Sequence, residues 1–256
     1  MSEPGVLESG GNDMNAVIFG GGKIARGFVA QLLHQSRFHI TFVELNEKLV
    51  ESLNQNQKYY VNVMGNAGES QWITDFQCVS LTDIPAIAEA LRTADIAFTS
   101  VGGKNLGSLA KTIAEAFGQI AGELEGRTFT IVTCENWKEP GKQLQAGIER
   151  ELKDEKLQGL FEKHVGVSEA VILRSGVEAT PDVLKIDANA VSVTDYWELP
   201  IDKSRMKGEL VSFKGVNYKD NFAGFLQQKL YTFNTTNATI AYVGRLRGLE
   251  LLSDAA

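Results

Sequence analysis

The chain has 256 residues, of which 43% are hydrophobic and 22% are charged, and its formal net charge is -7 at pH 7. This composition is ordinary for a globular protein with one large domain or two modest ones. The acidic balance argues against nucleic acid as a partner, because a phosphate backbone requires a basic surface. No apolar run approaches the roughly 20 residues that span a bilayer, and the first residues lack the apolar core of a secretory signal.

The cysteines and histidines form no disulfide or metal pattern. Cys78 and Cys134 lack CxxC spacing, which is typical of proteins in a reducing compartment. His34, His39 and His164 match no HExxH motif or comparable ligand spacing. We therefore expect a cytoplasmic protein that uses no metal and has neither nucleic acid nor membrane as a partner.

Short apolar runs alternate with helical stretches in the first part of the chain. The runs at 15–20, 39–44, 95–102 and 127–136 predict strands, and amphipathic stretches between them predict helices. Strands that are apolar on both faces are typical of a parallel sheet covered by helices on both sides. The expected fold is α/β, a Rossmann-type doubly wound, mostly parallel sheet, into which residues 59–81 insert short extended pieces.

The pattern changes after about residue 165. Alternating segments at 165–174, 182–191 and 192–200 predict a mixed extension of the sheet, and residues 219–252 predict helices again. A single helical stretch is too short to bury a core of its own. We therefore expect an incomplete C-terminal helical domain, either truncated or completed by a partner chain.

A dinucleotide-binding motif follows the first predicted strand. Gly20, Gly22 and Ala25 match GxGxxG/A, in which the glycines permit a tight turn and close approach of a pyrophosphate, and the small third residue lets the helix pack on the strand. The helix that starts near Lys23 directs N–H groups and a partial positive charge toward the phosphates. Glu44 ends the second strand about 20 residues later, where ribose hydroxyls bind. Because its carboxylate repels a 2′-phosphate, NAD is favoured over NADP.

Three further residues complete the expected cofactor site. Gly21 fills the variable position of the motif, Ile24 stands at the start of the helix, and Gly102 ends the strand at 95–102. Purely structural interpretations stay open for these residues, because turns use glycine for its conformational freedom alone. Glu44 by itself could equally be a solvated carboxylate at a strand end.

Five segments together resemble a known family: "FGGGKIARGF", "FVELN", "TCEN", "HVG" and "QKLYTFNTTNATIAYVGRL". They are similar to the mannitol-1-phosphate 5-dehydrogenases of the polyol-specific long-chain dehydrogenase family, from about Met14 to the end of the chain. The resemblance implies metal-free hydride transfer between NAD(H) and a sugar or polyol phosphate, with mannitol 1-phosphate and fructose 6-phosphate as the pair. A hexuronate reductase or a free-polyol dehydrogenase of the same family is the alternative.

In the family, a helix carries the pattern K-x-x-x-x-N-x-x-H, and the last segment matches it except at the final position. The resemblance implies that Lys229 is the general acid/base, and that Asn234 and Asn136 hydrogen-bond the substrate oxygen. Asn237 stands where the family has histidine, so one titratable ring is missing next to the substrate. A lysine acts as a base near neutral pH only where desolvation or positive charge lowers its pKa. On sequence alone, a lysine on an amphipathic helix is more often a solvated surface residue.

The resemblance also implies the domain limits. We expect a flexible N-terminal extension at 1–13, an NAD-binding domain at 14–198, and the start of a helical substrate domain at 199–256. Family members continue with further helices that close the substrate cleft. The absent histidine and the missing helices leave a second class open, a catalytically inactive NAD-binding fragment.

Overall fold

The computed structural model describes residues 14–255, and the extension expected at 1–13 lies outside the described residues. The chain divides into two compact units, Met1–Tyr218 and Lys219–Ala256. Residues 199–218, which the sequence placed with the helical domain, belong to the first unit.

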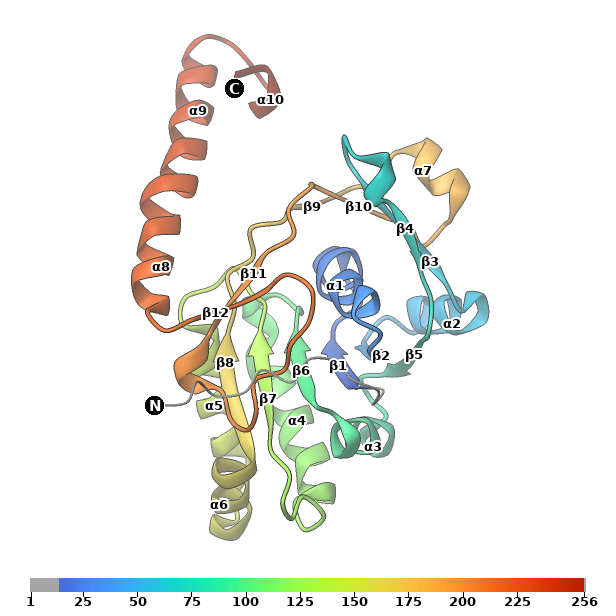
Figure 1. Ribbon diagram of the computed structural model, residues 1–256, viewed down its shortest axis with the longest axis vertical. Coiled ribbons are helices and arrows are strands. Elements are labelled where there is room, and N and C mark those ends of the chain that lie inside the picture. Colours follow the sequence, from blue (N-terminus) through green and yellow to red (C-terminus); the bar gives the residue numbers. More distant parts are fainter. Residues whose placement is uncertain (1–13, 256) are drawn as a thin grey trace. The chain divides into compact units, whose positions relative to one another are not determined.

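Six strands form the main sheet of the first unit (Figure 1). They are β1 (Asn15–Phe19), β2 (His39–Glu44), β5 (Phe76–Ser80), β6 (Ile96–Thr99), β7 (Phe129–Thr133) and β8 (Val165–Glu169). Their order is β5-β2-β1-β6-β7-β8, and every neighbouring pair is parallel. This is the Rossmann order, in which the direction of winding reverses between β1 and β6. The predicted doubly wound parallel sheet is confirmed.

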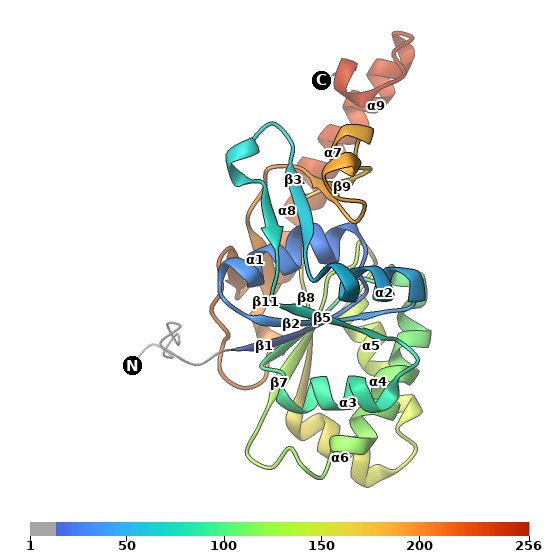
Figure 2. The ribbon, with the colours of Figure 1, turned by 90° about the vertical axis from the view of Figure 1, so that its right-hand side faces the viewer.

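Helices cover both faces of this sheet (Figure 2). One face packs against η1 (Ala25–Val29), α1 (Ala30–Gln35) and α2 (Glu47–Asn56), and the other against α3 (Ile84–Thr93), α4 (Leu106–Ile120), α5 (Pro140–Glu151) and α6 (Glu155–His164). Successive residues of β1 alternate between the two cores, with Ile18 in the first and Val17 and Phe19 in the second. Because both faces are buried, the strand is a continuous apolar run rather than an alternating one.

A second, mixed sheet lies on the far side of α1 (Figure 1). Its order is β4-β3-β10-β9, formed by β4 (Gln71–Ile73), β3 (Tyr59–Val63), β10 (Val191–Val193) and β9 (Gly176–Val177). β3 and β10 are parallel, and both outer pairs are antiparallel. The predicted mixed extension is therefore a separate sheet. The segment at 59–81 supplies two of its strands and, through β5, one strand of the main sheet.

One segment predicted as extended is a helix instead. α7 (Pro181–Ile186) occupies the first half of 182–191, so the strand prediction there is wrong. Pro181 at the first helical position explains the difference, because its fixed φ suits the first turn of a helix. The other elements of this unit are η2 (Ala67–Glu69), η3 (Gly103–Asn105), η4 (Lys203–Arg205) and the paired strands β11 (Leu199–Asp202) and β12 (Val216–Lys219).

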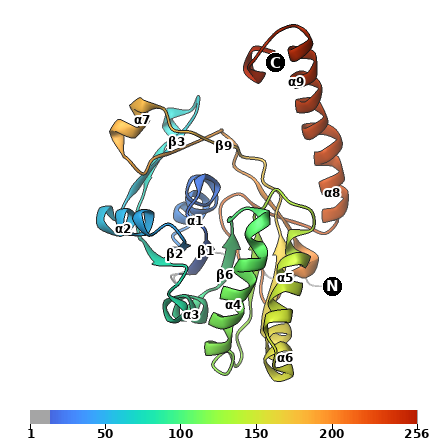
Figure 3. The same cartoon turned by 180° about the vertical axis from the view of Figure 1, so that it is seen from behind.

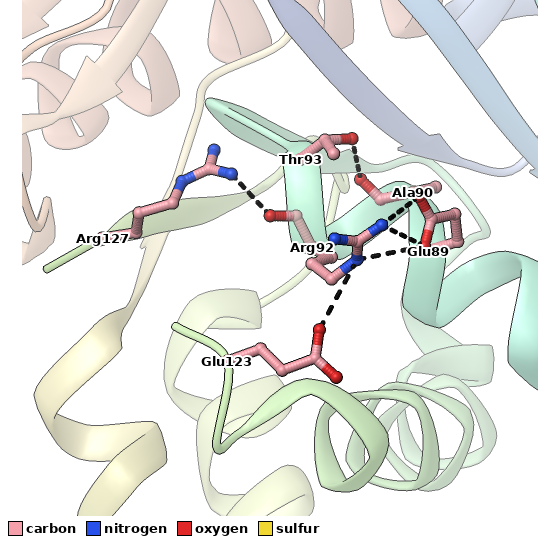
Figure 4. Close-up of polar contacts among 6 residues, drawn as sticks. All are labelled: Glu89, Ala90, Arg92, Thr93, Glu123 and Arg127. Carbon is pink, nitrogen blue, oxygen red and sulfur yellow. Dashed lines mark hydrogen bonds and ion pairs between the residues drawn. The ribbon is translucent and has the colours of Figure 1, made fainter. Parts of the chain in front are cut away.

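An exposed polar cluster joins the elements at the amino-terminal edge of the main sheet (Figure 4). Arg92, in the last turn of α3, forms ion pairs with Glu89 and Glu123. Arg127 donates to the carbonyl oxygens of Arg92 and Ala94 at 2.6 and 3.2 Å. These contacts connect α3 to the segments that lead into β6 and β7, at the end opposite to the strands' carboxyl termini.

The second unit is a long helix followed by a short one (Figure 3). The long helix comprises α8 (Phe222–Lys229), the π-helical turn η5 (Leu230–Asn234) and α9 (Thr235–Leu246), and α10 (Leu252–Ala255) follows. α10 packs on α9 at Gly244, where a Cβ would lie 2.5 Å from that of Ala255. The helices predicted for 219–252 are confirmed.

Candidate functional site

The glycine turn lies at the carboxyl ends of β1, β2 and β6. Gly20 has φ +100°, and a Cβ built there would lie 2.4 Å from the carbonyl oxygen of Ser100. Both the backbone angle and this close approach therefore require glycine. The Gly20 N–H donates to the carbonyl of Val43 at 2.7 Å. The turn thus connects the ends of β2 and β6 at the point where the winding reverses, which is where open α/β sheets bind ligands.

Glu44 closes the glycine turn from the side of β2. One carboxylate oxygen accepts the Gly21 N–H, and the other accepts the Asn46 N–H at 2.8 Å. Gly22 is different, because it is exposed and a Cβ built there meets no atom within 4 Å. Open space at the point where a glycine turn enters a helix is the arrangement that a pyrophosphate requires.

Arg26 holds the start of the helix in place. The helix begins at Lys23, as predicted. The Arg26 guanidinium donates to the carbonyls of Gly21 and Asn189, and the Tyr59 hydroxyl donates to the Arg26 carbonyl at 2.9 Å. Burial lowers the pKa of Arg26. Arg26 therefore ties the glycine turn to the second sheet, a role that the sequence analysis missed.

The side chains of the other three residues in this segment have different surroundings. Lys23 forms an ion pair with Glu178, Ile24 is partly buried against the core, and Ala25 is fully buried. A buried small residue is what the third position of the motif needs for close packing of the helix. Contacts of Lys23, Ile24 and Ala25 with a cofactor stay predictions.

A buried carboxylate that the sequence analysis missed links the end of β7 to the loop after β6. Glu135 is 7% exposed. One of its oxygens accepts the Thr99 hydroxyl at 3.1 Å and the Val101 N–H at 2.9 Å, and the other accepts the Gly102 N–H at 2.9 Å. Gly102, a predicted cofactor residue, is exposed and has φ +85°. The available signal was a charged residue two positions after β7, a strand that is buried along its whole length.

Asn136 lies between two residues that hold the same loop. It is exposed beyond the carboxyl end of β7, and Glu135 precedes it. Trp137 follows and packs on Gly103, where a Cβ would lie 2.2 Å from Cγ of the indole ring. Asn136 is therefore held at the edge of the sheet where a ligand of the glycine turn would bind.

The other three candidate residues lie on the long helix of the second unit. Lys229 directly precedes the π-turn, Asn234 ends it, and Asn237 follows three residues later. In a regular α-helix, residues five apart are separated by about 140° around the axis. The wider π-turn brings Lys229 and Asn234 toward one face, and Asn237 continues it. The Thr235 hydroxyl supports the turn by donating to the Leu230 carbonyl at 3.0 Å.

Lys229 differs from the two asparagines in its exposure. Its side chain is partly buried, and this burial lowers its pKa from the ordinary lysine value. Asn234 and Asn237 are exposed. A lowered lysine pKa is the direction that general-base chemistry requires.

The described residues 14–255 contain no cluster of three or more His, Cys, Asp or Glu side chains that could hold a metal ion. Cys78 and Cys134 are free and buried, and burial raises the pKa of the Cys78 thiol to about 12. In the same part of the chain, no helix combines the length and apolarity needed to cross a membrane.

Comparison with known proteins extends over nearly the whole chain. Residues 14–215 match the family described as the mannitol dehydrogenase Rossmann domain. A mannitol-1-phosphate 5-dehydrogenase from Shouchella clausii is 32% identical over 243 residues, and one from Brevibacillus brevis is 31% identical over 242. Each match covers 94% of this chain, but the chain spans only 63% and 61% of the lengths of these relatives.

Two solved structures share the fold over 95% of the chain. They are a substrate-free D-sorbitol dehydrogenase, with a TM-score of 0.74 and 16% identity, and the Pseudomonas fluorescens mannitol 2-dehydrogenase in a ternary complex with NAD and D-mannitol, with 0.70 and 14%. This chain covers 61% and 60% of those chains. At such low identity the likeness shows the fold alone.

Proposed function

This chain belongs to the mannitol dehydrogenase family, and we propose that it is an NAD-dependent oxidoreductase of polyol phosphates. The reaction moves a hydride between NAD(H) and a substrate pair, mannitol 1-phosphate and fructose 6-phosphate. Mannitol 1-phosphate is the substrate in the names of the two curated relatives. Because the net charge is -7, the surface as a whole does not attract an anionic substrate. The phosphate of the substrate therefore requires specific recognition by a local group of residues.

The glycine turn is the observation that carries the cofactor part of this proposal. Gly20 fits its position only as glycine, and Gly22 borders open space at the start of a helix. The N-terminus of that helix favours the negative charge of a pyrophosphate. Glu44 ends β2 and would bind ribose hydroxyls while repelling a 2′-phosphate. Bound NAD supplies the acceptor of the hydride.

Lys229 is the proposed acid and base. As its neutral amine, it accepts the hydroxyl proton of the polyol while the hydride leaves carbon, and as ammonium it returns a proton when the ketose is reduced. Its lowered pKa supports this role. The family resemblance assigns to Asn234 and to Asn136 a hydrogen bond with the substrate oxygen, and such donors stabilise alkoxide character. Asn237 can hydrogen-bond but does not titrate, so the lysine handles the proton alone.

The test compares NADH oxidation with fructose 6-phosphate, fructose, fructuronate and tagaturonate. We expect fructose 6-phosphate to have the highest kcat/KM. Lys229→Ala should lower kcat by about 10³-fold with an unchanged Kd for NADH, because general acid–base catalysis contributes roughly that much. Lys185→Ala is the matched control, since Lys185 is exposed and forms an ion pair with Asp182 on its own helix. A higher kcat/KM for fructuronate, tagaturonate or free fructose would contradict the proposed phosphate substrate and favour the corresponding alternative in the family.

An NAD-binding protein without activity is the second candidate. Asn237 favours it, because the family resemblance implies a histidine there. NADH binding without turnover of any of the four sugars would establish it. Absence of NADH binding would overturn both candidates.

A further inference from the structure

Glu135 is a buried carboxylate that the proposed chemistry leaves unused. We propose that it is a positioning residue that sets the redox preference of the site, because its negative charge favours the oxidised, positively charged dinucleotide over the reduced one. This inference rests on the proposed NAD-dependent function. Three lines of observation support it: the charge, its place in the sheet and its contacts with the loop after β6.

Within residues 14–255, no ion pair provides a cation that balances the charge of Glu135. Its three hydrogen-bond donors are the hydroxyl of Thr99 and the backbone N–H groups of Val101 and Gly102, all of which are neutral. The ion pairs formed within the described part of the chain do not include it. Hydrogen bonds offset the cost of burying a carboxylate, but they leave its net charge in place. The negative charge of Glu135 also acts on the neighbouring Cys134, whose pKa is raised by burial and by the Glu135 carboxylate.

The position of Glu135 coincides with one half of the dinucleotide site. In the Rossmann order, each half of the sheet binds one nucleotide. Glu44, the proposed partner of the adenosine ribose, ends β2, so the adenosine half of the site is formed by β1, β2 and β5. The nicotinamide half is therefore formed by β6, β7 and β8. Glu135 follows β7 and bonds to the loop after β6, so its carboxylate belongs to that half.

The contacts of Glu135 also fix two predicted site residues. Its carboxylate holds the Gly102 N–H, and its backbone leads directly into Asn136. Trp137 packs on Gly103 from the other side of Asn136. Contacts on both sides of Asn136 therefore hold it against the loop after β6.

The physical consequence is a difference between two redox states. The oxidised nicotinamide ring carries a positive charge and the reduced ring carries none, so a fixed negative charge attracts only the oxidised form. In a partly desolvated site, one charge in the same half of the site changes the ratio of the dissociation constants for NAD⁺ and NADH by about three- to tenfold. A purely structural role would weaken both forms equally.

The experiment measures Kd for NAD⁺ and for NADH on the full chain by calorimetry and by NADH fluorescence. Glu135→Gln keeps the shape and removes the charge, and we expect NAD⁺ affinity to fall about three- to tenfold more than NADH affinity. Glu135→Asp keeps the charge and should keep the ratio within about twofold, even where both affinities fall. Equal losses for both forms in Glu135→Gln would overturn the inference.

A second charge-free variant avoids the amide N–H group that glutamine would place against that of Gly102. Glu135→Met combined with Thr99→Val replaces both partners of the Thr99 hydrogen bond with apolar groups. It leaves the N–H groups of Val101 and Gly102 without this acceptor, so its folded state is checked by circular dichroism before the two dissociation constants are measured. It should shift the ratio in the same direction as Glu135→Gln. An unshifted ratio in the folded double variant would overturn the inference.

Asp95→Asn is the matched control. Asp95 accepts the Asn15 N–H at 2.7 Å at the opposite, amino-terminal edge of the sheet, so its loss should leave the ratio unchanged. An equal shift of the NAD⁺/NADH ratio in Asp95→Asn would overturn the inference, since a carboxylate far from the site would then have the same effect as Glu135. A wild-type chain that binds neither dinucleotide overturns the proposed function as well. Binding with the same ratio in all variants overturns only the role of Glu135.

Discussion

The two units hold their candidate residues in different ways. In the first unit, Gly20 and Glu135 are held at the ends of buried strands by close packing and by hydrogen bonds from other strands. In the second, Lys229 stands on a helix whose large apolar side chains include Tyr242 and Leu246, 75% and 88% exposed. The proposed cofactor binding therefore depends on packing within the first unit, whereas the proposed proton chemistry depends on the geometry of one helical turn. Each can be altered without the other.

The largest expected effect comes from breaking the packing at Gly20. Gly20→Ala combines φ +100° with a Cβ 2.4 Å from the Ser100 carbonyl oxygen. We expect NADH binding to be lost and the free energy of unfolding to fall by about 2–4 kcal/mol. Denaturant unfolding and NADH titration measure the two effects.

Gly65→Ala is the matched control for Gly20→Ala. Gly65 also has a positive φ, +75°, but a Cβ there meets no atom within 4 Å. We expect a loss of only about 1 kcal/mol and normal binding of NADH. Similar losses in the two variants would show that backbone strain alone, and not the close approach to Ser100, explains the requirement for glycine.

The helix of the second unit can be altered without changing a candidate side chain. Inserting one alanine after Tyr231 lengthens the segment between Lys229 and Asn234 by one residue, and Asn234 and Asn237 then rotate by about 100° relative to Lys229. We expect kcat to fall by about 100-fold because the groups no longer converge on one oxygen. Circular dichroism should show unchanged helix content, and the Kd for NADH should stay the same.

Tyr231→Ala is the control for this insertion, since it keeps the length of the turn. Its kcat should stay within about twofold of the wild-type value, because the tyrosine side chain is 75% exposed. An unchanged kcat after the insertion would contradict the idea that the π-turn aligns the three residues.

Glu44→Gln changes the cofactor half while keeping an acceptor for the Gly21 N–H. Removal of the negative charge should improve NADPH affinity by about tenfold relative to NADH, because a 2′-phosphate is no longer repelled. Glu47→Gln, at an exposed position in the first turn of α2, should leave this ratio unchanged. If Glu44→Gln still excludes NADPH, another group sets the preference.

The pH profile gives the smallest effect. Burial lowers the pKa of Lys229, so its amine becomes neutral at a lower pH than that of a free lysine. Oxidation of the polyol needs the neutral amine and should rise with pH through this pKa, whereas reduction of the ketose needs the ammonium and should fall. Steady-state rates in both directions test this. Profiles that rise together in both directions would contradict the role of Lys229.

Much of the first unit could be predicted because its signals are local. A strand buried on both faces, such as β1, is a continuous apolar run. The motif that begins at Gly20 has fixed spacing because the turn, the pyrophosphate and the helix start follow one another directly. The helix in the second unit was predictable for the same reason, but the π-turn was not, since it shifts the register without changing the pattern of residue types.

The sequence by itself determined the parallel sheet, the glycine turn, Glu44 and the long C-terminal helix, because each depends on residues close together in the chain. Only the tertiary structure decided that β3 pairs with β10 in a separate sheet, and that Glu135 binds Thr99, Val101 and Gly102. Those partners come from distant segments, and a hydrogen bond between distant segments leaves no periodic pattern in the sequence. The buried charge could therefore be recognised only after the strands were placed side by side.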